Sequence, residues 1–210
     1  MSQPTPPRKK VSKIQLLALG LILIGLAIML PRGFRMYQSY QEIEFARKHQ
    51  FQTGDVSPDL LRPWMTIRYI AVSYAVPQEY LFDAVGIPPR RENSMISIAR
   101  LNQQLGLGTK NGEPIVLDRI GEAILAYRAN PVPTGLIERQ VMGWMNLQYI
   151  ANSTGIPTEV LFDEIGIPAN GNAYIPLDVL SDKLHYEGGP RSLVQAVQRV
   201  VDAHSEKKPQ

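Results

Sequence analysis

An internal repeat constrains the fold of this chain more than any other feature. Residues 64–88 and residues 144–168 align without a gap at an offset of 80, and 14 of the 25 positions are identical. After a shift of one residue, the apolar positions of residues 96–105 match those of residues 175–184. Such self-similarity indicates that one supersecondary unit occurs twice in the chain.

Each copy is predicted to be helical. Apolar residues recur at helical spacing at the start of the first copy, at Trp64, Ile67, Ile70, Ala71 and Tyr74. Pro77 is expected at the first position of a second, short helix, with Glu79 in its first turn, and Gly86 followed by Pro88 ends that helix. The complete pattern predicts helix, turn, helix, loop, helix, loop and helix. No run alternates with period two for long enough to predict a strand.

The expected fold class is therefore all-α, with a single N-terminal transmembrane helix followed by two helix-turn-helix-like modules. Module 1 is defined as residues 61–128 and module 2 as residues 141–204. The linker between them, residues 129–140, is rich in Pro and Gly, and residues 205–210 form a polar tail. One copy has a modest core, so packing of the copies on each other or on a partner would bury more surface.

A membrane anchor is predicted at residues 14–31. The run IQLLALGLILIGLAIML holds 17 residues, of which Gln15 alone is strongly polar, and Pro31 follows it. At about 1.5 Å per residue the run covers roughly 26 Å, close to the thickness of a bilayer's hydrocarbon core. No small-x-small cleavage pattern closes the run, which favours an uncleaved anchor over a signal peptide. The apolar residues expected to anchor the helix in the membrane include Ile14, Leu17, Leu21, Leu26 and Leu30.

Charge distribution sets the predicted orientation. Residues 1–50 carry eight basic and two acidic residues, a net charge of +6, whereas residues 51–210 carry 14 basic and 17 acidic residues, a net charge of −3. Basic residues beside a membrane helix mark its cytoplasmic side. Arg8, Lys9, Lys10 and Lys13 precede the run, whereas only Arg32 and Arg35 lie within the first dozen residues after it. We therefore expect residues 1–13 in the cytoplasm, the helix in the lipid bilayer of the cell membrane, and both modules on the outer side, periplasmic or extracellular.

Residues 32–60 are predicted to form a juxtamembrane helix and a linker. Phe34, Tyr37 and Tyr40 recur at three-residue spacing in this segment. The spacing fits an aromatic belt at the membrane surface or contacts with a partner, and an ordinary exposed helix would show it equally well.

The residues that could support chemistry do not form a recognisable catalytic or metal-binding pattern. The chain has no cysteine, which excludes disulfides, thiolate metal sites and covalent c-type haem. Asp83 and Asp163 recur once per copy, but no second acid, base or nucleophile recurs with them at a spacing that general acid–base catalysis would need. The histidines at 49, 185 and 204 share no helical turn or short loop. We therefore expect neither an enzyme nor a cofactor or metal site.

Nucleic acid is not an expected partner, although helix-turn-helix geometry raises the question. The candidate recognition helices read PQEYLFDAVG and PTEVLFDEIG, which contain several acids and no basic residue. Carboxylates on such a helix would repel phosphates. The residues 106–112, GLGTKNG, lack the order of a phosphate-binding loop and are expected to form a turn.

Aromatic residues repeated in the two copies are candidates for a core or for an interface. Trp64 and Trp144 share the phase of the apolar stripe, which favours the core, yet each is large enough to fill a partner's pocket. Phe82 and Phe162 lie in a repeated Leu-Phe-Asp triplet. All four are taken as interface candidates beside the three juxtamembrane aromatics.

The repeated phrase also carries a resemblance. Both copies contain Trp-Met-x3-Tyr-Ile-Ala, then Val/Ile-Pro, Leu-Phe-Asp-x2 and Gly-Ile-Pro. This resembles short helical repeats that accompany membrane-bound redox proteins in some bacteria, over residues 64–128 and 141–203. The resemblance implies an accessory subunit of a respiratory or photosynthetic electron-transfer complex, such as the quinol-oxidising alternative complex III of filamentous phototrophic bacteria. It carries over no catalytic residue, because the shared motif is structural.

Two functional expectations follow. The first is a non-catalytic, single-pass accessory subunit that binds the subunits of an integral membrane complex, extends the complex outside the cytoplasm and helps a soluble carrier to dock. The second is a free-standing, membrane-tethered binding module for a peptide or a glycan. A DNA-binding version of the second would require the modules to lie in the cytoplasm.

Overall fold

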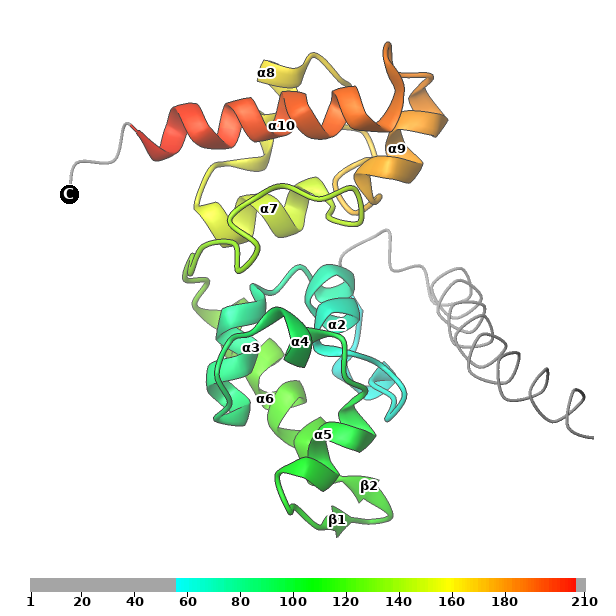
Figure 1. Ribbon diagram of the computed structural model, residues 1–210, viewed down its shortest axis with the longest axis vertical. Coiled ribbons are helices and arrows are strands. Elements are labelled where there is room, and N and C mark those ends of the chain that lie inside the picture. The colour runs from blue at the N-terminus through cyan, green and yellow to red at the C-terminus, as the bar shows by residue number, and fades with distance from the viewer. Residues whose placement is uncertain (1–55, 207–210) are drawn as a thin grey trace, which may run out of the picture. The chain divides into compact units, whose positions relative to one another are not determined.

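The computed structural model describes residues 56–206, and these residues are mostly helical (Figure 1). The predicted anchor and the aromatics Phe34, Tyr37 and Tyr40 lie outside the described residues. Within residues 56–206, no helix is both long and apolar enough to cross a membrane. The all-α class is confirmed for this part of the chain.

Module 1 contains four helices of the predicted pattern, together with a one-turn helix and a small hairpin. The elements are α2 (Ile67–Tyr74), α3 (Gln78–Val85), α4 (Arg91–Ser94), α5 (Ile98–Gln104), β1 (Thr109–Lys110), β2 (Glu113–Pro114) and α6 (Ile115–Ala129). A short 3-10 helix, η2 (Pro58–Leu60), precedes them. It belongs with module 1, because the Tyr74 hydroxyl donates to Ser57 O at 3.0 Å and Arg128 Nη2 donates to Val56 O at 2.8 Å.

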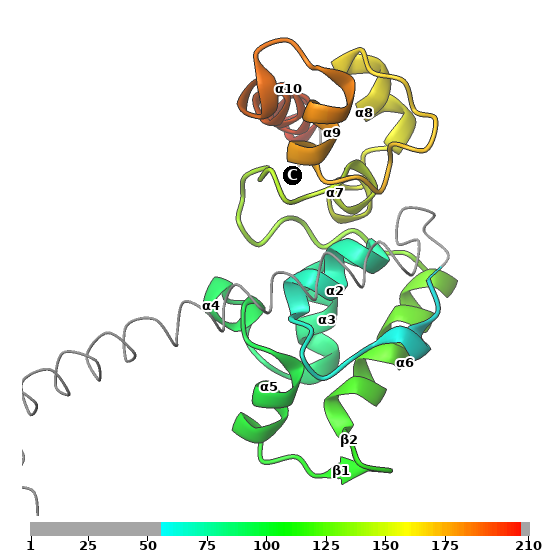
Figure 2. The same cartoon turned by 90° about the vertical axis from the view of Figure 1, so that its right-hand side faces the viewer.

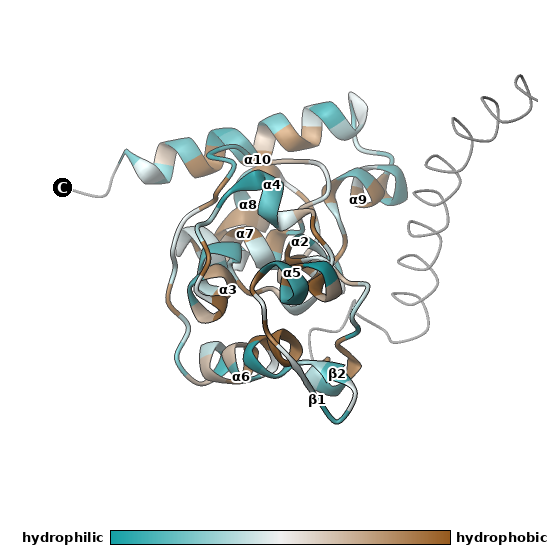
Figure 3. Ribbon diagram, turned by 60° about the horizontal axis from the view of Figure 1, so that its bottom comes forward, coloured by the Kyte–Doolittle hydropathy of each residue, from teal (hydrophilic) through white to brown (hydrophobic). Residues whose placement is uncertain are grey.

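Module 2 repeats the four main helices. They are α7 (Leu147–Thr154), α8 (Thr158–Ile165), α9 (Leu177–Leu184) and α10 (Gly189–Ser205). Brown and teal bands alternate along α10 in Figure 3, as expected for a helix that buries one face. The buried residues of that face are Leu193, Ala196, Val197, Val200 and Val201.

The first helix of each module begins later than the apolar spacing predicts. Thr66 caps α2 by accepting a hydrogen bond from Tyr69 N at 3.1 Å, and Asn146 caps α7 by accepting from Tyr149 N at 2.7 Å. Trp64 therefore lies before α2, although the apolar spacing placed it in that helix. Trp144 likewise lies before α7. The polar cap residue just before the apolar run was the signal that could have placed this start.

Backbone hydrogen bonds confirm that residues 96–105 correspond to residues 175–184, the part of the repeat that follows the one-residue shift. Ile98 N donates to Met65 O at 2.8 Å, and Leu177 N donates to Met145 O at the same distance. Both methionines are fully buried. In module 1 this hydrogen bond joins the start of α5 to the residues just before α2. In module 2 the equivalent bond joins the start of α9 to the residues just before α7.

A two-residue hairpin at residues 109–114 was not predicted. Thr109 pairs with Pro114 and Lys110 with Glu113 around Asn111 and Gly112. These two turn residues have φ angles of 54° and 84°, the left-handed region that a tight hairpin turn requires. The predicted turn is thus confirmed, and the Asn-Gly dipeptide was the available signal for the flanking strands.

Candidate functional site

The modules meet through α2 and α7, the first helix of each copy (Figure 2). Asn146 Nδ2 donates to Val72 O at 3.0 Å, and Asn152 Nδ2 donates to Ala75 O at 2.6 Å. Two amide side chains of module 2 thus bind main-chain carbonyls at the end of α2. Because these carbonyls belong to the backbone, the contacts fix the position of the helix itself.

Aromatic and cationic side chains border the same contact. The Arg68 guanidinium lies 5.1 Å from the centroid of the Trp144 ring, an arrangement typical of a cation–π interaction. The Tyr127 hydroxyl donates to Asn152 O at 3.3 Å. The half-buried Trp144 is therefore part of the junction between the modules, whereas Trp64, also half-buried, packs on Tyr69 at a centroid distance of 5.4 Å.

A buried polar cluster links module 1, the linker and module 2. Gln78 Nε2 donates to the Tyr149 hydroxyl at 3.1 Å and to Glu138 Oε1 at 3.3 Å, and Gln78 and Tyr149 are 1% and 0% exposed. Burial raises the pKa of Tyr149 to about 12, against the opposing effect of its hydrogen bond with Gln78. The hydroxyl therefore stays neutral far above physiological pH.

Three of the side chains that join the modules by hydrogen bonds lie at positions where the two copies differ, whereas Trp144 and Tyr149 are identical to their counterparts Trp64 and Tyr69. The residues of module 1 and their counterparts in module 2 are Thr66 and Asn146, Val72 and Asn152, and Gln78 and Thr158. The identical positions, by contrast, include the fully buried methionines and phenylalanines of both cores. Sequence comparison between the copies could have indicated these positions, but not what they bind.

Phe82 and Phe162 do not lie where an interface with a partner would need them. They are 0% and 3% exposed, because each points into the core of its own module. The structure therefore corrects their assignment as interface candidates. The partly exposed Trp64 and Trp144 keep a surface that a partner could contact.

The repeated acids Asp83 and Asp163 lie on α3 and α8, and both side chains are exposed. The structure brings neither of them into an ion pair with the described residues. Within residues 56–206, no group of three or more His, Asp or Glu side chains is arranged to hold a metal ion.

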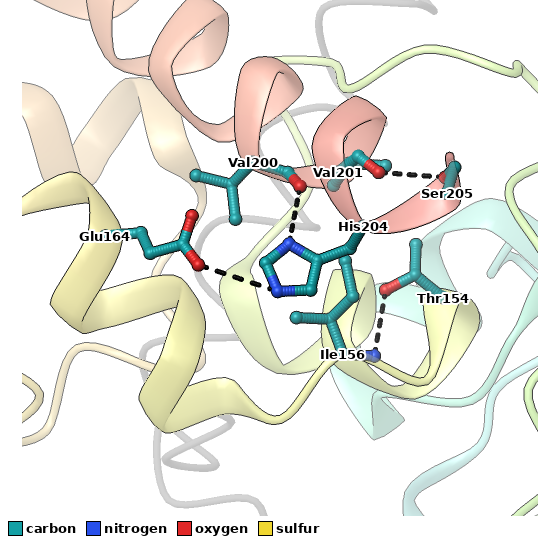
Figure 4. Close-up of polar contacts among 7 residues, drawn as sticks. All are labelled: Thr154, Ile156, Glu164, Val200, Val201, His204 and Ser205. Carbon is teal, nitrogen blue, oxygen red and sulfur yellow. Dashed lines mark hydrogen bonds and ion pairs between the residues drawn. The ribbon is translucent and has the colours of Figure 1, made fainter. Parts of the chain in front are cut away.

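His204 is half-buried on α10. Its Nδ1 lies 2.9 Å from Val200 O, and its Nε2 lies 3.5 Å from Glu164 Oε1, so the ring bridges α10 and α8 (Figure 4). His185, in contrast, is exposed at the end of α9, and His49 lies outside the described residues. The contacts of His204 therefore join two helices of module 2.

Comparison with known proteins leaves the function to be argued from the chain itself. No protein-family model matches this sequence, and neither a curated protein nor a solved structure is significantly similar to it.

Proposed function

We propose that this chain is a non-catalytic, single-pass membrane subunit whose two modules bind a partner within a larger membrane complex. The observation that carries the proposal is the junction between the modules. Asn146, Asn152 and Gln78 hold two copies of one module together through side-chain hydrogen bonds. A surface built across two fixed modules loses less conformational freedom when it binds than two independent modules would.

The charge of the modules supports a protein partner more than a lipid surface. Residues 56–206 carry 12 basic and 16 acidic residues, a net charge of −4. Anionic headgroups would repel such a surface, whereas residues 1–50, which include the predicted anchor, carry +6 and are attracted to them. The division of charge favours an anchor that lies in the bilayer and modules that face a protein.

We further propose that the partner complex carries out electron transfer. This part of the proposal rests on the resemblance of the repeated motif. In that setting the modules would cover or extend a respiratory or photosynthetic complex and help a soluble carrier to dock. Alternative complex III is the candidate complex.

Affinity purification of the full chain in a mild detergent tests the partner, with a tag placed after Gln210. We expect integral membrane subunits to co-purify in stoichiometric amounts, and haem absorption in the eluate would support the electron-transfer setting. A control preparation, tagged identically and washed in a harsh detergent, should lose these subunits. Recovery of a solitary, colourless chain from the mild detergent would contradict the proposal.

The proposed orientation has a separate test, because the chain has no cysteine of its own. Asp163→Cys places a thiol on an exposed face of α8, and Ser2→Cys places one before the predicted anchor. We expect a membrane-impermeant maleimide to label the first variant in intact cells and the second only after lysis. The reverse pattern would place the modules in the cytoplasm.

The alternative function is a free-standing tethered binding module for a peptide or a glycan. A cavity of about 270 Å³ beside the linker favours this second candidate. DNA remains the weakest form of it, because α3 and α8 carry no basic residue. If the chain purifies without partner subunits and its modules lie outside the cytoplasm, the results would favour binding of a peptide or a glycan.

A further inference from the structure

The two modules meet head to tail, through different faces of the repeated unit. The residues that module 1 contributes to the junction are Arg68, Val72, Ala75 and Gln78. The residues that module 2 contributes are Trp144, Asn146, Tyr149 and Asn152. At the offset of 80, the face of module 2 corresponds to Trp64, Thr66, Tyr69 and Val72 of module 1. Module 1 therefore has its own copy of the face that receives α2 in module 2, and we call this copy its receiving face.

The receiving face of module 1 has the same aromatic pair as its counterpart. Trp64 packs on Tyr69 at a centroid distance of 5.4 Å, and Trp144 packs on Tyr149 at 6.0 Å. In module 2 this pair is contacted by α2, whose Arg68 guanidinium lies over the Trp144 ring. An equivalent occupant of the receiving face would be a segment that brings a cation to Trp64.

The occupant of such a face has a defined direction. Val72 O accepts a hydrogen bond from Asn146, the cap at the start of α7, and Ala75 O accepts from Asn152, near the end of α7. The helix α2 therefore lies along α7 in the same chain direction. A segment that lay on α2 in the same way would end beside the C-terminal end of α2.

The described chain begins close to that place. Ser57 O accepts a hydrogen bond at 3.0 Å from the hydroxyl of Tyr74, which is the last residue of α2. Val56, just before Ser57, is 3% exposed and so is held against module 1. Residues 46–55, which come directly before Val56, are therefore within reach of the receiving face.

Residues 46–55 carry the features that this position requires. Arg47 precedes Gly54 by seven residues, as Arg68 precedes Ala75, the residue that ends α2. Ala75 has a φ angle of 52°, in the left-handed region that glycine adopts most readily. When Gly54 takes the place of Ala75, Arg47 takes the place of Arg68 and reaches the tryptophan of the receiving face.

An apolar contact would replace the amides of the junction. Module 1 has Thr66 and Val72 where module 2 has Asn146 and Asn152, so the receiving face lacks both amide donors. Phe51 lies in the preceding segment, four residues after its arginine. Burial of this ring against Val72 would be favourable, because it removes apolar surface from water.

A second copy of the chain is a poorer occupant of the receiving face. Its α2 is already held by its own module 2. Its α7 has Gln148 at the position of Arg68, so that helix would bring no cation to the tryptophan. Near the end of α7, Ser153 O is also bound already, by Gly135 N of the linker at 2.7 Å.

We propose that residues 46–55 dock on the receiving face of module 1, with the Arg47 guanidinium over the Trp64 ring and Phe51 against Val72. The segment and the face belong to one chain and are separated by few residues. Their effective concentration is therefore high, which favours docking even through a small number of contacts.

Docking would shorten the free chain that follows the predicted anchor. Residues 32–45 span at most about 50 Å when fully extended, whereas residues 32–55 span at most about 85 Å. The modules would thus be kept nearer to the membrane, where the proposed complex lies. The docking itself goes beyond the proposed function, because it needs no partner.

Quenching of a bimane label by tryptophan tests the contact, because the chain has no cysteine and only two tryptophans. Gln50→Cys carries the label on the full chain in a neutral detergent, and Trp144→Phe leaves Trp64 as the quencher. Trp64→Phe leaves Trp144 instead, and the chain without either tryptophan is the reference. We expect quenching by Trp64 and none by Trp144. Emission equal to the reference when Trp64 is present would overturn the proposal.

Substitutions in the segment distinguish docking from random collisions between the label and Trp64. Arg47→Gln should lower the ratio of docked to free chain about two- to fivefold, the change expected for an exposed cation–π contact. Phe51→Ser should lower it about tenfold, because the buried ring is lost. Lys48→Gln, which removes the neighbouring cation, is the matched control and should leave the emission unchanged. Quenching that survives both changes, or an equal loss in the control, would overturn the proposal.

Mixing tests whether the contact lies within one chain. A labelled chain without tryptophan should not be quenched by an unlabelled chain that contains Trp64, and quenching in the mixture would show that a second copy occupies the face. The proposed function is tested separately by the affinity purification. If Trp64 quenches the label but the chain purifies without membrane subunits, the docking stands and the proposed function fails.

Discussion

Modules 1 and 2 have the same interior and different surfaces. Met65 and Met145 are fully buried at corresponding positions, and each accepts a hydrogen bond of 2.8 Å from the start of the third helix. Module 1 carries eight basic and six acidic residues, a net charge of +2, whereas module 2 has a net charge of −4. Most of the repeated residues thus maintain the two cores, whereas the diverged residues Asn146, Asn152 and Gln78 supply the amide groups that join the modules, together with the repeated Tyr149.

The shared interior predicts equal and large losses of stability in the two copies. Phe82→Ala and Phe162→Ala each remove a buried ring, so each should lower the free energy of unfolding by about 3–5 kcal/mol. Urea unfolding of the full chain, followed by circular dichroism, measures both values. Leu125→Ala, at a side chain that is 56% exposed on α6, should change stability by less than about 0.5 kcal/mol. A large difference between the two phenylalanines would show that the modules are not energetically equivalent.

The two modules differ first at a buried polar residue, which lies on α5 in module 1 and on α9 in module 2. Asn102, on α5, donates to Leu107 O at 2.8 Å and to Gly108 O at 3.0 Å, and its Oδ1 accepts from Val116 N at 3.2 Å. Asn102→Ala should therefore cost about 2–3 kcal/mol, because it leaves several main-chain groups without partners.

Ser181, on α9, takes the place of Asn102 in module 2. Its Oγ is buried and has no hydrogen-bond partner within residues 56–206. Ser181→Ala should leave the free energy of unfolding unchanged to within about 0.5 kcal/mol, or raise it. The same urea experiment compares the two alanine variants, and equal losses at both positions would contradict the assigned hydrogen bonds.

These elements also show how far the sequence could be interpreted. The helices, their order and the correspondence of the copies follow from local apolar spacing and from Gly and Pro, so they were predicted. Phe82 and Phe162 each follow a leucine that is fully buried, Leu81 or Leu161, and the apolar face of these short helices was the available signal for placing both phenylalanines in the core.

The junction could not be predicted in the same way. Asn146 and Asn152 bind the carbonyls of Val72 and Ala75, which are 74 and 77 residues away in the chain. A main-chain carbonyl has no signature in the sequence, so comparison of the copies indicates only that these positions differ. The cavity beside Ser153 depends on the path of the linker, and residue spacing contains no information about that path either.

A second difference between the copies concerns pH. Tyr69 and Tyr149 occupy the same position, but Tyr69 is half-buried, whereas Tyr149 is enclosed by Gln78 and the linker. Burial raises the pKa of Tyr149 from 10.0 to about 12. Stability from this residue is therefore complete below pH 10 and is lost as the pH rises toward 12, because the unfolded chain releases the proton first.

Tyr149→Phe should remove this contribution to the pH dependence. Between pH 9 and about 11.5, wild type should lose about 2 kcal/mol more unfolding free energy than Tyr149→Phe. Urea unfolding at the two pH values measures the difference, and Tyr69→Phe is the matched control. The pKa values of Tyr74, Tyr127 and Tyr174 are also raised by burial, and these residues are present in every variant, so their effect cancels. Equal pH dependence in Tyr149→Phe and wild type would contradict the enclosure of this hydroxyl.

The smallest expected effect tests the junction most directly. Asn146→Thr introduces the residue that module 1 has at this position, where Thr66 caps α2 at 3.1 Å. The cap of α7 should therefore survive, while the hydrogen bond to Val72 O is lost, at a cost of about 1 kcal/mol. The reverse change, Thr66→Asn, keeps a cap without adding a bond between modules and should cost less than about 0.5 kcal/mol.

The chain contains two tryptophans, one in each module, and Trp144 also contacts Arg68 of module 1, so each exchange is compared with its own single-tryptophan background. Urea unfolding of the Trp64→Phe and Trp144→Phe backgrounds, followed by fluorescence, gives one midpoint for each module. If the junction couples the modules, Asn146→Thr lowers both midpoints or separates them, and Thr66→Asn does neither. Equal effects of the two exchanges would show that the amide of Asn146 does not join the modules. The linker and the buried cluster around Gln78 would then have to hold the tandem together.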